Sequence, residues 1–450
     1  MAKDLRSFLG ELESNAPDEL MRVKREVDLR YETSAVAERL GQEGRYPALL
    51  FEKVKGFNIP VVTNLFARRS RLAFALRTTE ADLNRVYRER EDKLVKPVLV
   101  EDGPVKEVVI KGSDVDLSRL PIPLHNEKDG APYITCGAMV VKDPETGIRN
   151  VGIYRHMVEG RNKVGIHLAE TSHATLIYEK WAQRGKAMPV AITIGHHPAF
   201  FLGVLSFLPF GVDEYEVVGA LMEEPLELVK CETVDLEVPA YAEIVLEGEI
   251  DPTERAREGP IGEYTTLYGA PRDNPVVTIN AILMRKNPIF LDVVNGHPDH
   301  QLLGGIGRLS FIYKMVRAAC PTVKDVFMPP SGCCRLTCYV SIKKRHEGEA
   351  QNVAAAVFAA DPFVKYVVVV DDDVDIFNDS AVLRAIATRL HADGGAFMVR
   401  NAKGHPLDPT ARNEFLVTKV GIDATKPLKG FPETVRVPGS DTLDLSKYLS

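Results

Sequence analysis

The segment Glu258-Gly259-Pro260-Ile261-Gly262-Glu263-Tyr264 places two carboxylates five positions apart, in a stretch that also contains two glycines and a proline. Glycine and proline disfavour a regular helix interior, so this segment is not one. Upstream, Asn150-Val151-Gly152-Ile153-Tyr154-Arg155 is strand-like and ends in a cation. An arginine held against the two acids would keep one ionised and leave the other able to carry a proton. These residues predict an acid/base enzyme; the alternative is two solvated loop glutamates and a surface arginine.

The composition is that of an ordinary globular protein. A chain of 450 residues can form two or three domains, and its 45% hydrophobic and 26% charged content fits that class. The net charge of −7 argues against a nucleic-acid-binding protein, for which a basic surface is expected. No apolar run is long enough to cross a bilayer, the charged N-terminus is unlike a secretory signal, and the six cysteines have neither disulfide nor zinc spacing. We therefore expect a cytoplasmic enzyme without nucleic-acid or membrane partners.

The hydrophobic pattern changes twice along the chain. Residues 4–40 have the apolar periodicity of packed amphipathic helices. From about 98 to 290 the sequence is rich in β-branched residues bounded by turns, interrupted by helical patterns at 174–184 and 214–222. This middle region predicts a barrel or a sandwich. After about 319, strand and helix patterns alternate, which indicates an α/β domain at the C-terminal end.

Several motifs, in order along the chain, resemble those of the UbiD-type decarboxylases, which use prenylated FMN to remove or add carboxyl groups on unsaturated and aromatic acids. The resemblance is carried first by Asn-x-Gly-x-Tyr-Arg at 150–155, followed about a hundred residues later by Glu-Gly-Pro-x-Gly-Glu at 258–263. It extends nearly end to end, through residues 47–51, 120–123, 132–135, 226–231, 238–240, 243–248 and 371–375. Several ordered motifs in one chain are far more specific than any one of them.

The resemblance implies a multidomain α+β fold of the UbiD type. Its centre would be a split β-barrel flavin-binding domain over residues 98–285. An N-terminal α/β domain over 1–97 would be completed by the chain at about 286–318. A C-terminal α/β domain over 319–450 would build a homo-oligomer, a dimer or a hexamer. A flavin prenyltransferase would be needed to supply the cofactor.

Decarboxylation at an unsaturated carbon leaves a carbanion that no side chain can delocalise, so the reaction needs a cofactor as electron sink. The chain has no Walker phosphate loop, and the glycines at 304, 305 and 307 lack the full G-x-G-x-x-G spacing. The resemblance implies prenylated FMN, with its phosphate bound by Mn²⁺ or Mg²⁺ and with K⁺ as an additional cation.

By the matching motifs, the metal ligands would be Asn150, His173 and Glu214, with Glu216 as an alternative to Glu214. Oxygen ligands with one imidazole suit a hard divalent ion. The remaining cofactor-binding residues implied by the resemblance are Ile153, Tyr154, Arg155, Ser172, Ser206 and Lys365. For Lys365, the alternative is an exposed lysine at the edge of a strand.

For catalysis, the resemblance makes Glu263 the acid that protonates the substrate carbon after carbon dioxide leaves. Burial and a neighbouring carboxylate would favour its protonated form. Glu258, paired with Arg155, would remain anionic and set the orientation of the arginine. Arg155 would also engage the departing carboxylate.

Three further residues, His300, Arg308 and Arg335, are candidates to bind a second anionic group of the substrate, because arginine binds carboxylates bidentately. This trio resembles that of the furan-2,5-dicarboxylate decarboxylases, which makes furan-2,5-dicarboxylate the favoured substrate and furan-2-carboxylate the product. Structural salt bridges are the alternative for both arginines. Other open readings are the same chemistry on a mono-acid such as pyrrole-2-carboxylate or a hydroxybenzoate, a non-autonomous subunit of a carboxylase complex, and a metallohydrolase.

Overall fold

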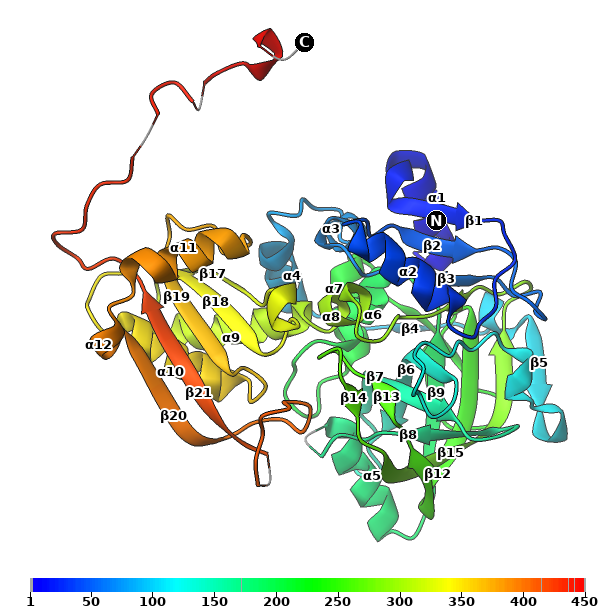
Figure 1. The fold of residues 1–450 in the computed structure, drawn as a ribbon. Helices are drawn as coiled ribbons and strands as arrows, with labels where there is room; N and C mark the ends of the chain where they lie inside the picture. Colours follow the sequence, from blue (N-terminus) through cyan, green and yellow to red (C-terminus); the bar gives the residue numbers. More distant parts are fainter. Residues whose placement is uncertain (1–2, 171, 414, 436, 441, 449–450) are drawn as a thin grey trace.

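The computed structural model describes residues 3–170, 172–413, 415–435, 437–440 and 442–448. Figure 1 shows an N-terminal α/β part in dark blue, a β-barrel in cyan to green, and a C-terminal α/β domain in yellow to orange. The predicted multidomain α+β fold with a central barrel is confirmed. After β21, Lys426 and Leu428 still bond the C-terminal domain, and beyond Phe431 the described part of the chain extends away from it (Figure 1). Among the described residues, no helix combines the length and apolar composition that a membrane crossing requires.

The N-terminal part is built around a four-stranded sheet. In spatial order its strands are β1 (Leu20–Val23), β2 (Ala48–Phe51), β3 (Val61–Thr63) and β16 (Phe290–Leu291). Strand β16 pairs in parallel with β3, so the chain returns to this sheet after completing the barrel. The helices are α1 (Leu5–Asn15), α2 (Glu32–Gln42), α3 (Arg69–Ala75) and α4 (Leu83–Glu91). Asp4 caps α1, and the helix buries one apolar face, as its periodicity predicts.

The central sheet closes into a barrel. Its seven strands run in the order β12-β9-β6-β7-β8-β15-β5, and β12 also pairs with β15. These strands are β5 (Val108–Lys111), β6 (Tyr133–Lys142), β7 (Arg149–Val158), β8 (Lys163–Ile166), β9 (Met188–Ile194), β12 (Ile244–Glu258) and β15 (Arg272–Met284). Alternate residues of β9 belong to two different core clusters: Val190 and Ile192 to one, Ala191 to the other. Both faces of the barrel wall are therefore buried, since side chains alternate along a strand.

Shorter elements complete the barrel domain. They are the strands β4 (Val98–Leu99), β10 (Glu227–Lys230) and β11 (Glu237–Pro239), the hairpin β13 (Ile261–Gly262) and β14 (Tyr268–Gly269), and the helices α5 (His173–Gln183), α6 (Pro198–Val204) and α7 (Glu214–Met222). Helices α5 and α7 lie where the sequence pattern predicts helices. The buried apolar helix α6 was not anticipated, because a short helix without a polar face has no periodicity to detect.

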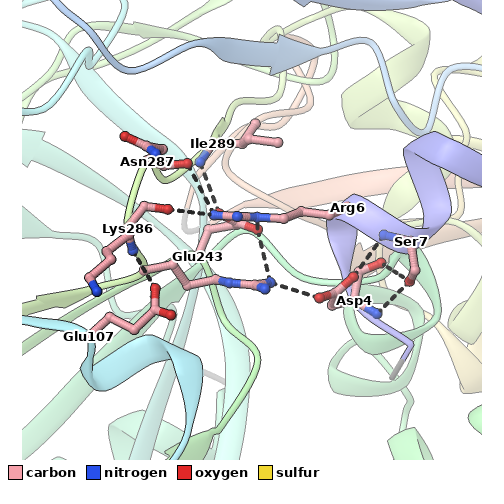
Figure 2. Close-up of polar contacts among 9 residues, drawn as sticks. Asp4, Arg6, Ser7, Glu107, Glu243, Lys286, Asn287 and Ile289 are labelled. Atoms are coloured by element: carbon pink, nitrogen blue, oxygen red, sulfur yellow. Dashed lines mark hydrogen bonds and ion pairs between the residues drawn. The ribbon is translucent and has the colours of Figure 1, made fainter. Parts of the chain in front are cut away.

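A buried carboxylate joins the N-terminal helix to the barrel (Figure 2). Glu243 is fully buried, and Arg6 of α1 donates to it from Nε at 2.8 Å and from Nη2 at 2.9 Å. Arg285, after β15, donates to both Glu243 and Asp4. The backbone amide of Ile289 donates to Glu243 at 3.0 Å. These contacts fix α1 against the ends of two barrel strands, because a buried charge is stable only when fully paired.

The C-terminal domain contains a five-stranded mixed sheet in the order β17-β18-β19-β21-β20. Its strands are β17 (Val323–Phe327), β18 (Thr337–Ile342), β19 (Tyr366–Asp371), β20 (Ala396–Lys403) and β21 (Leu416–Ala424). Helices α8 (Pro298–Leu303) and α9 (Ile306–Ala319) lead into it, and α10 (Glu349–Ala360), α11 (Asp379–Arg389) and α12 (Ala392–Gly395) follow. The acidic run at 371–375 is paired locally: Arg389 bonds Asp371 and Asp373.

Candidate active site

The structure brings Arg155, Glu258 and Glu263 together, although they come from three different elements. Arg155 lies on β7, Glu258 ends β12, and Glu263 follows β13. Arg155 donates from Nε and Nη2 to the two oxygens of Glu258, both at 3.0 Å, and its Nη1 also contacts the carboxylate of Glu263. A planar guanidinium suits this arrangement, because its fork matches one carboxylate bidentately and leaves a further donor for the second.

Glu258 is completely buried, and its charge is compensated by four hydrogen bonds. Besides Arg155, the hydroxyl of Tyr133 donates at 2.9 Å and the amide of Asn274 at 2.8 Å. Sequence reasoning missed both neighbours, since they lie on β6 and β15 and share no motif with Glu258. This network fixes Glu258, and Glu258 in turn fixes the plane of Arg155.

The environment of Glu263 favours its protonated form. Its side chain is only 7% exposed, and burial raises its pKa, while Arg155 opposes and Glu258 adds to this shift. For Arg155, burial lowers the pKa, but Glu263 and Glu258 outweigh it and raise the pKa, so the guanidinium remains charged. Burial, followed by the charge of Arg155, lowers the pKa of the nearby His167 to about 4. The cluster can thus hold one cation and one carboxylate and still carry a transferable proton.

Two of the predicted metal ligands are bonded to each other. Asn150 donates from Nδ2 to Glu214 at 2.7 Å, and the amide of Val151 donates to the other Glu214 oxygen at 2.7 Å. Burial raises the pKa of Glu214 to about 8, and the carbonyl oxygen Oδ1 of Asn150 is buried without a partner. His173, at the start of α5, lines the same small cavity as Asn150.

These residues fit a hard divalent cation. An orphaned amide oxygen and a buried carboxylate without a cationic partner are groups that such an ion would satisfy. Within the described residues there is no group of three His, Cys, Asp or Glu side chains suited to a metal, so a site here depends on the amide oxygen of Asn150. Glu214 is the better of the two candidates, because it bonds Asn150 directly, whereas Glu216 lines a neighbouring, larger cavity.

The other predicted cofactor-binding residues are distributed more widely. Ile153 and Tyr154 lie on β7 between Asn150 and Arg155, and Ser172 caps α5 beside His173. Ser206 bonds the hydroxyl of Tyr87 at 2.5 Å after α6. Lys365 lies before β19 in the C-terminal domain, where it pairs with Asp408 at 3.2 Å. The roles of Ser206 and Lys365 toward a cofactor therefore stay predictions.

Of the residues predicted to bind a second anion, Arg335 stands out. It is 7% exposed and donates only to the backbone carbonyls of Gln301 and Cys334; among the described residues, no carboxylate pairs with it. Burial, followed by the charge of Arg308, lowers its pKa to about 10, so it remains charged at neutral pH. A Cβ atom on Gly304 would overlap the guanidinium, so a side chain there would displace Arg335 from this position.

Unlike Arg335, Arg308 has a carboxylate partner, and His300 is not charged. Arg308 pairs with Asp361 at 2.6 Å and lies between the rings of Phe207 and Phe363, so the salt-bridge alternative holds for this arginine. Burial, with the charges of Arg335 and then Arg155, lowers the pKa of His300 to about 3. His300 is therefore neutral at pH 7, and the expected trio consists of two cations and one neutral imidazole.

Tyr264 lies between the residues predicted to bind the second anion and the acid cluster, the name used here for Arg155, Glu258 and Glu263. It follows Glu263 directly, its ring lies edge-on to His300 with centroids 6.4 Å apart, and the guanidinium of Arg335 is 5.6 Å from its centroid. Its hydroxyl is buried without a hydrogen-bond partner. Tyr264 could have been found from the sequence, because it directly follows the candidate acid Glu263. Phe363, whose ring is 6.1 Å from that of Tyr264, comes from the C-terminal domain and had no such signal.

The fold is that of the UbiD class, and the chain belongs to the UbiD family. Three family models of 3-octaprenyl-4-hydroxybenzoate carboxy-lyase match consecutive stretches: the N-terminal domain at 12–90, the Rift-related domain at 96–298 and the C-terminal domain at 301–424. The protein is accordingly a prenylated-FMN-dependent carboxy-lyase.

Among similar proteins is the UbiD-class enzyme HmfF from Pelotomaculum thermopropionicum, solved with FMN. It is 41% identical with a TM-score of 0.94, covering 99% of this chain and 100% of its own. An evolved dimeric form of HmfF holds prenylated FMN; it is 38% identical, has a TM-score of 0.91 and covers both chains completely. The anhydromevalonate phosphate decarboxylase of Methanothermobacter thermautotrophicus is 36% identical over 97% of this chain and 100% of its own.

Proposed function

We propose that the protein catalyses the reversible, non-oxidative decarboxylation of a heteroaromatic acid that bears a second anionic group. The favoured substrate is furan-2,5-dicarboxylate, giving furan-2-carboxylate and carbon dioxide. The observation that carries this proposal is Arg335, a buried cation without a carboxylate partner, which reaches the acid cluster through Tyr264. Burying an unpaired guanidinium is costly, and an anionic substrate group would supply the missing partner.

Prenylated FMN, when bound, supplies the electron sink that the reaction needs. Asn150, His173 and Glu214 would hold a divalent ion, Mn²⁺ or Mg²⁺, that neutralises the cofactor phosphate. Ile153, Tyr154 and Ser172 lie between or beside these ligands and Arg155, which supports their predicted contacts with the same cofactor. Ser206 and Lys365 would complete the binding residues, with K⁺ as a further ion.

The chain's own residues divide the proton and charge transfer between them. Glu258 holds Arg155 in one orientation, and Arg155 engages the carboxylate that is lost. When the carbon–carbon bond breaks and carbon dioxide leaves, Glu263 gives its proton to the carbon atom left behind. In the carboxylation direction the ionised Glu263 removes that proton again. Burial of the cluster keeps bulk water from competing as a proton source.

At the far end of the substrate, Arg335, His300 and the hydroxyl of Tyr264 would bind the second carboxylate. Arg335 supplies the charge, and the unpartnered hydroxyl of Tyr264 supplies a hydrogen bond. Arg308 contributes a weaker field, because Asp361 already pairs with it. The cation and the proton donor Glu263 flank Tyr264, as the two ends of a rigid dianion require.

A second candidate is a phosphorylated unsaturated acid. Relatives with 36% and 38% identity over 97% and 94% of this chain are anhydromevalonate phosphate decarboxylases. Arginine binds phosphate as readily as carboxylate, so Arg335 suits either dianion. A mono-acid such as pyrrole-2-carboxylate or a hydroxybenzoate would leave Arg335 unpaired.

A substrate panel tests these alternatives. The protein, co-produced with a flavin prenyltransferase, would be assayed on furan-2,5-dicarboxylate, anhydromevalonate phosphate, pyrrole-2-carboxylate and a hydroxybenzoate. We expect the highest kcat/KM on furan-2,5-dicarboxylate. Preference for the phosphate favours the second candidate, and preference for a mono-acid contradicts a second-anion site. Loss of turnover on every acid, with the cofactor bound, favours a subunit of a larger complex.

We also propose that the C-terminal domain, residues 319–450, forms a homo-oligomer, a dimer or a hexamer. Exposed apolar side chains on this domain support an interface there, among them Leu383, Met398 and Val399. A dimeric form of HmfF is consistent with such assembly. Light scattering after size-exclusion chromatography measures the mass, and a monomer at micromolar concentration contradicts the proposal.

A further inference from the structure

The hairpin that carries Glu263 has little support of its own. Strands β13 and β14 pair through only two residue pairs, Ile261 with Gly269 and Gly262 with Tyr268. Two-stranded hairpins are marginally stable by themselves, so the position of Glu263 depends on what packs against the hairpin. One support comes from the loop of residues 126–130, which precedes β6 and is far away in sequence.

Three backbone groups connect this loop to the hairpin. The amide of Gly262 donates to Oδ1 of Asp129 at 2.9 Å, next in sequence to Glu263. The amide of Gly130 donates to the carbonyl of Pro260 at 2.8 Å. On the other side of the hairpin, the amide of Lys128 donates to the hydroxyl of Tyr268 at 3.2 Å. The loop thus holds both strands of the hairpin.

The loop is itself held in place. Oδ2 of Asp129 accepts from the backbone and side-chain amides of Asn126, at 2.9 and 3.1 Å. Just before the loop, His125 forms a fully buried pair with Asp292 at 2.9 Å. Just after it, Tyr133 donates to Glu258. The Asp129 carboxylate is therefore presented from a fixed support and not from a freely moving loop.

Loop and hairpin are also in close contact. A Cβ atom on Gly130 would lie 2.5 Å from the carbonyl oxygen of Gly259, and one on Gly262 would lie 2.5 Å from Nδ2 of Asn126. The backbone contact at Gly130 leaves no space for a side chain, whereas at Gly262 the Asn126 side chain would have to move. Asp129 is the charged group at this contact.

Asp129 also acts on Glu263 through its charge. Four charged groups face Glu263: Arg155 from β7, Glu258 from β12, Arg272 from β15 and Asp129 from the loop. Burial is the largest cause that raises the pKa of Glu263, and Glu258 and Asp129 add to it, whereas the two arginines oppose it. A nearby negative charge favours the neutral form of an acid.

We propose that Asp129 is a positioning residue for the proton donor, which fixes β13 through the amide of Gly262 and adds its negative charge beside the hairpin that carries Glu263. This inference rests on the proposed role of Glu263. Two substitutions separate its two parts. Asp129→Asn keeps one oxygen acceptor for Gly262 but removes the charge and the second acceptor, to which Asn126 donates, whereas Asp129→Ala removes all three. Asp116→Asn is the matched control, because Asp116 also accepts a backbone amide in a polar loop, that of Ser118 at 3.0 Å.

The first measurement is hydrogen–deuterium exchange by mass spectrometry on cofactor-free protein, which requires no turnover. In Asp129→Ala, the peptide covering 259–264 should exchange at least about tenfold faster, since Gly262 loses its acceptor. Asp129→Asn should exchange more slowly than Asp129→Ala, because it keeps the acceptor for Gly262, and Asp116→Asn should exchange at the wild-type rate. Wild-type exchange of this peptide in Asp129→Ala overturns the positioning role, whatever the substrate of the enzyme.

The second measurement is the pH profile of kcat with the cofactor-loaded enzyme and its best acid. Asp129→Asn should move the alkaline limb to lower pH by about 0.5 to 1 unit, because Glu263 loses one neighbouring negative charge. Asp129→Ala should lower kcat by about 10- to 100-fold through displacement of Glu263. An unmoved alkaline limb in Asp129→Asn overturns the electrostatic part. If the wild type itself turns over no acid, the proposed function fails, and the exchange result still decides the positioning role.

Discussion

Arg155 and Glu258 are joined by two hydrogen bonds of 3.0 Å each, and this pair leaves the third arm of the guanidinium directed at Glu263. In the proposed mechanism, this geometry makes Glu258 the group that orients Arg155 and leaves Glu263 as the acid that carries the proton. The two carboxylates differ in the number of hydrogen bonds that they accept, because Tyr133 and Asn274 donate to Glu258 in addition to Arg155.

The fork of Arg155 is the first feature to test. Arg155→Lys keeps the charge but cannot bond both oxygens of Glu258 and still reach Glu263. We expect kcat to fall by about 100-fold or more, because the reacting groups lose their alignment. Steady-state kinetics measure this, and cofactor content by absorbance serves as the control. A lysine variant with wild-type kcat would falsify the orienting role.

The activity should depend on pH through Glu263. Burial raises its pKa, so the proton is retained above the range in which an ordinary glutamate ionises. Decarboxylation needs the protonated form and should therefore decline as pH rises through this raised pKa. The pH profile of kcat measures the limb, and Glu263→Gln should abolish turnover at every pH. A profile without an alkaline limb contradicts this assignment.

The second-anion site depends on Arg335. Arg335→Met should raise KM for furan-2,5-dicarboxylate by about 30-fold or more, because the distal carboxylate loses its cation. The matched control is Arg88→Met, since Arg88 is a partly buried arginine paired with Asp325 at 2.9 Å on another element. Equal KM values for the wild type and Arg335→Met would rule out this pocket.

Tyr264 should contribute the hydrogen bond that accompanies the cation. Tyr264→Phe removes only a hydroxyl that has no hydrogen-bond partner among the described residues, so stability should not fall. The KM for the dianion should rise about tenfold or more. Tyr46→Phe provides the control, because its hydroxyl donates to Gly41 at 3.2 Å in the N-terminal part. A selective rise in KM with unchanged melting temperature is the expected pattern, and unchanged kinetics refutes it.

Metal retention should depend on Glu214. Glu214→Gln replaces a charged oxygen ligand by a neutral amide, which binds a hard ion more weakly. We expect the co-purified Mn²⁺ or Mg²⁺ to drop about tenfold, and the flavin with it. Elemental analysis and visible absorbance measure both. Glu216→Gln should retain wild-type content; loss of metal in that variant alone would assign the ligand to Glu216.

Much of this architecture was predictable. Helix α1, the β-rich middle and the alternating C-terminal domain follow from hydrophobic periodicity, which burial imposes locally. The motif at 258–263 and Arg155 were recognisable because motifs are short and contiguous. The sequence could not show that β12 pairs with β15 and closes the barrel, since strand pairing is non-local. It also suggested a cationic His300, whereas burial beside two arginines makes that imidazole neutral.

The order of residues alone therefore determined which chemical groups are present: one guanidinium, two acids and a set of oxygen and imidazole ligands. Only the tertiary structure decided which acid Arg155 bonds bidentately and which arginine lacks a carboxylate partner among the described residues, because those properties depend on neighbours. Tyr133, Asn274 and Asp129 reach the acid cluster from other elements, and Asp361 neutralises Arg308 but leaves Arg335 unpaired. Charge states in a buried site are set by desolvation and by partners brought from distant segments, which no local pattern encodes.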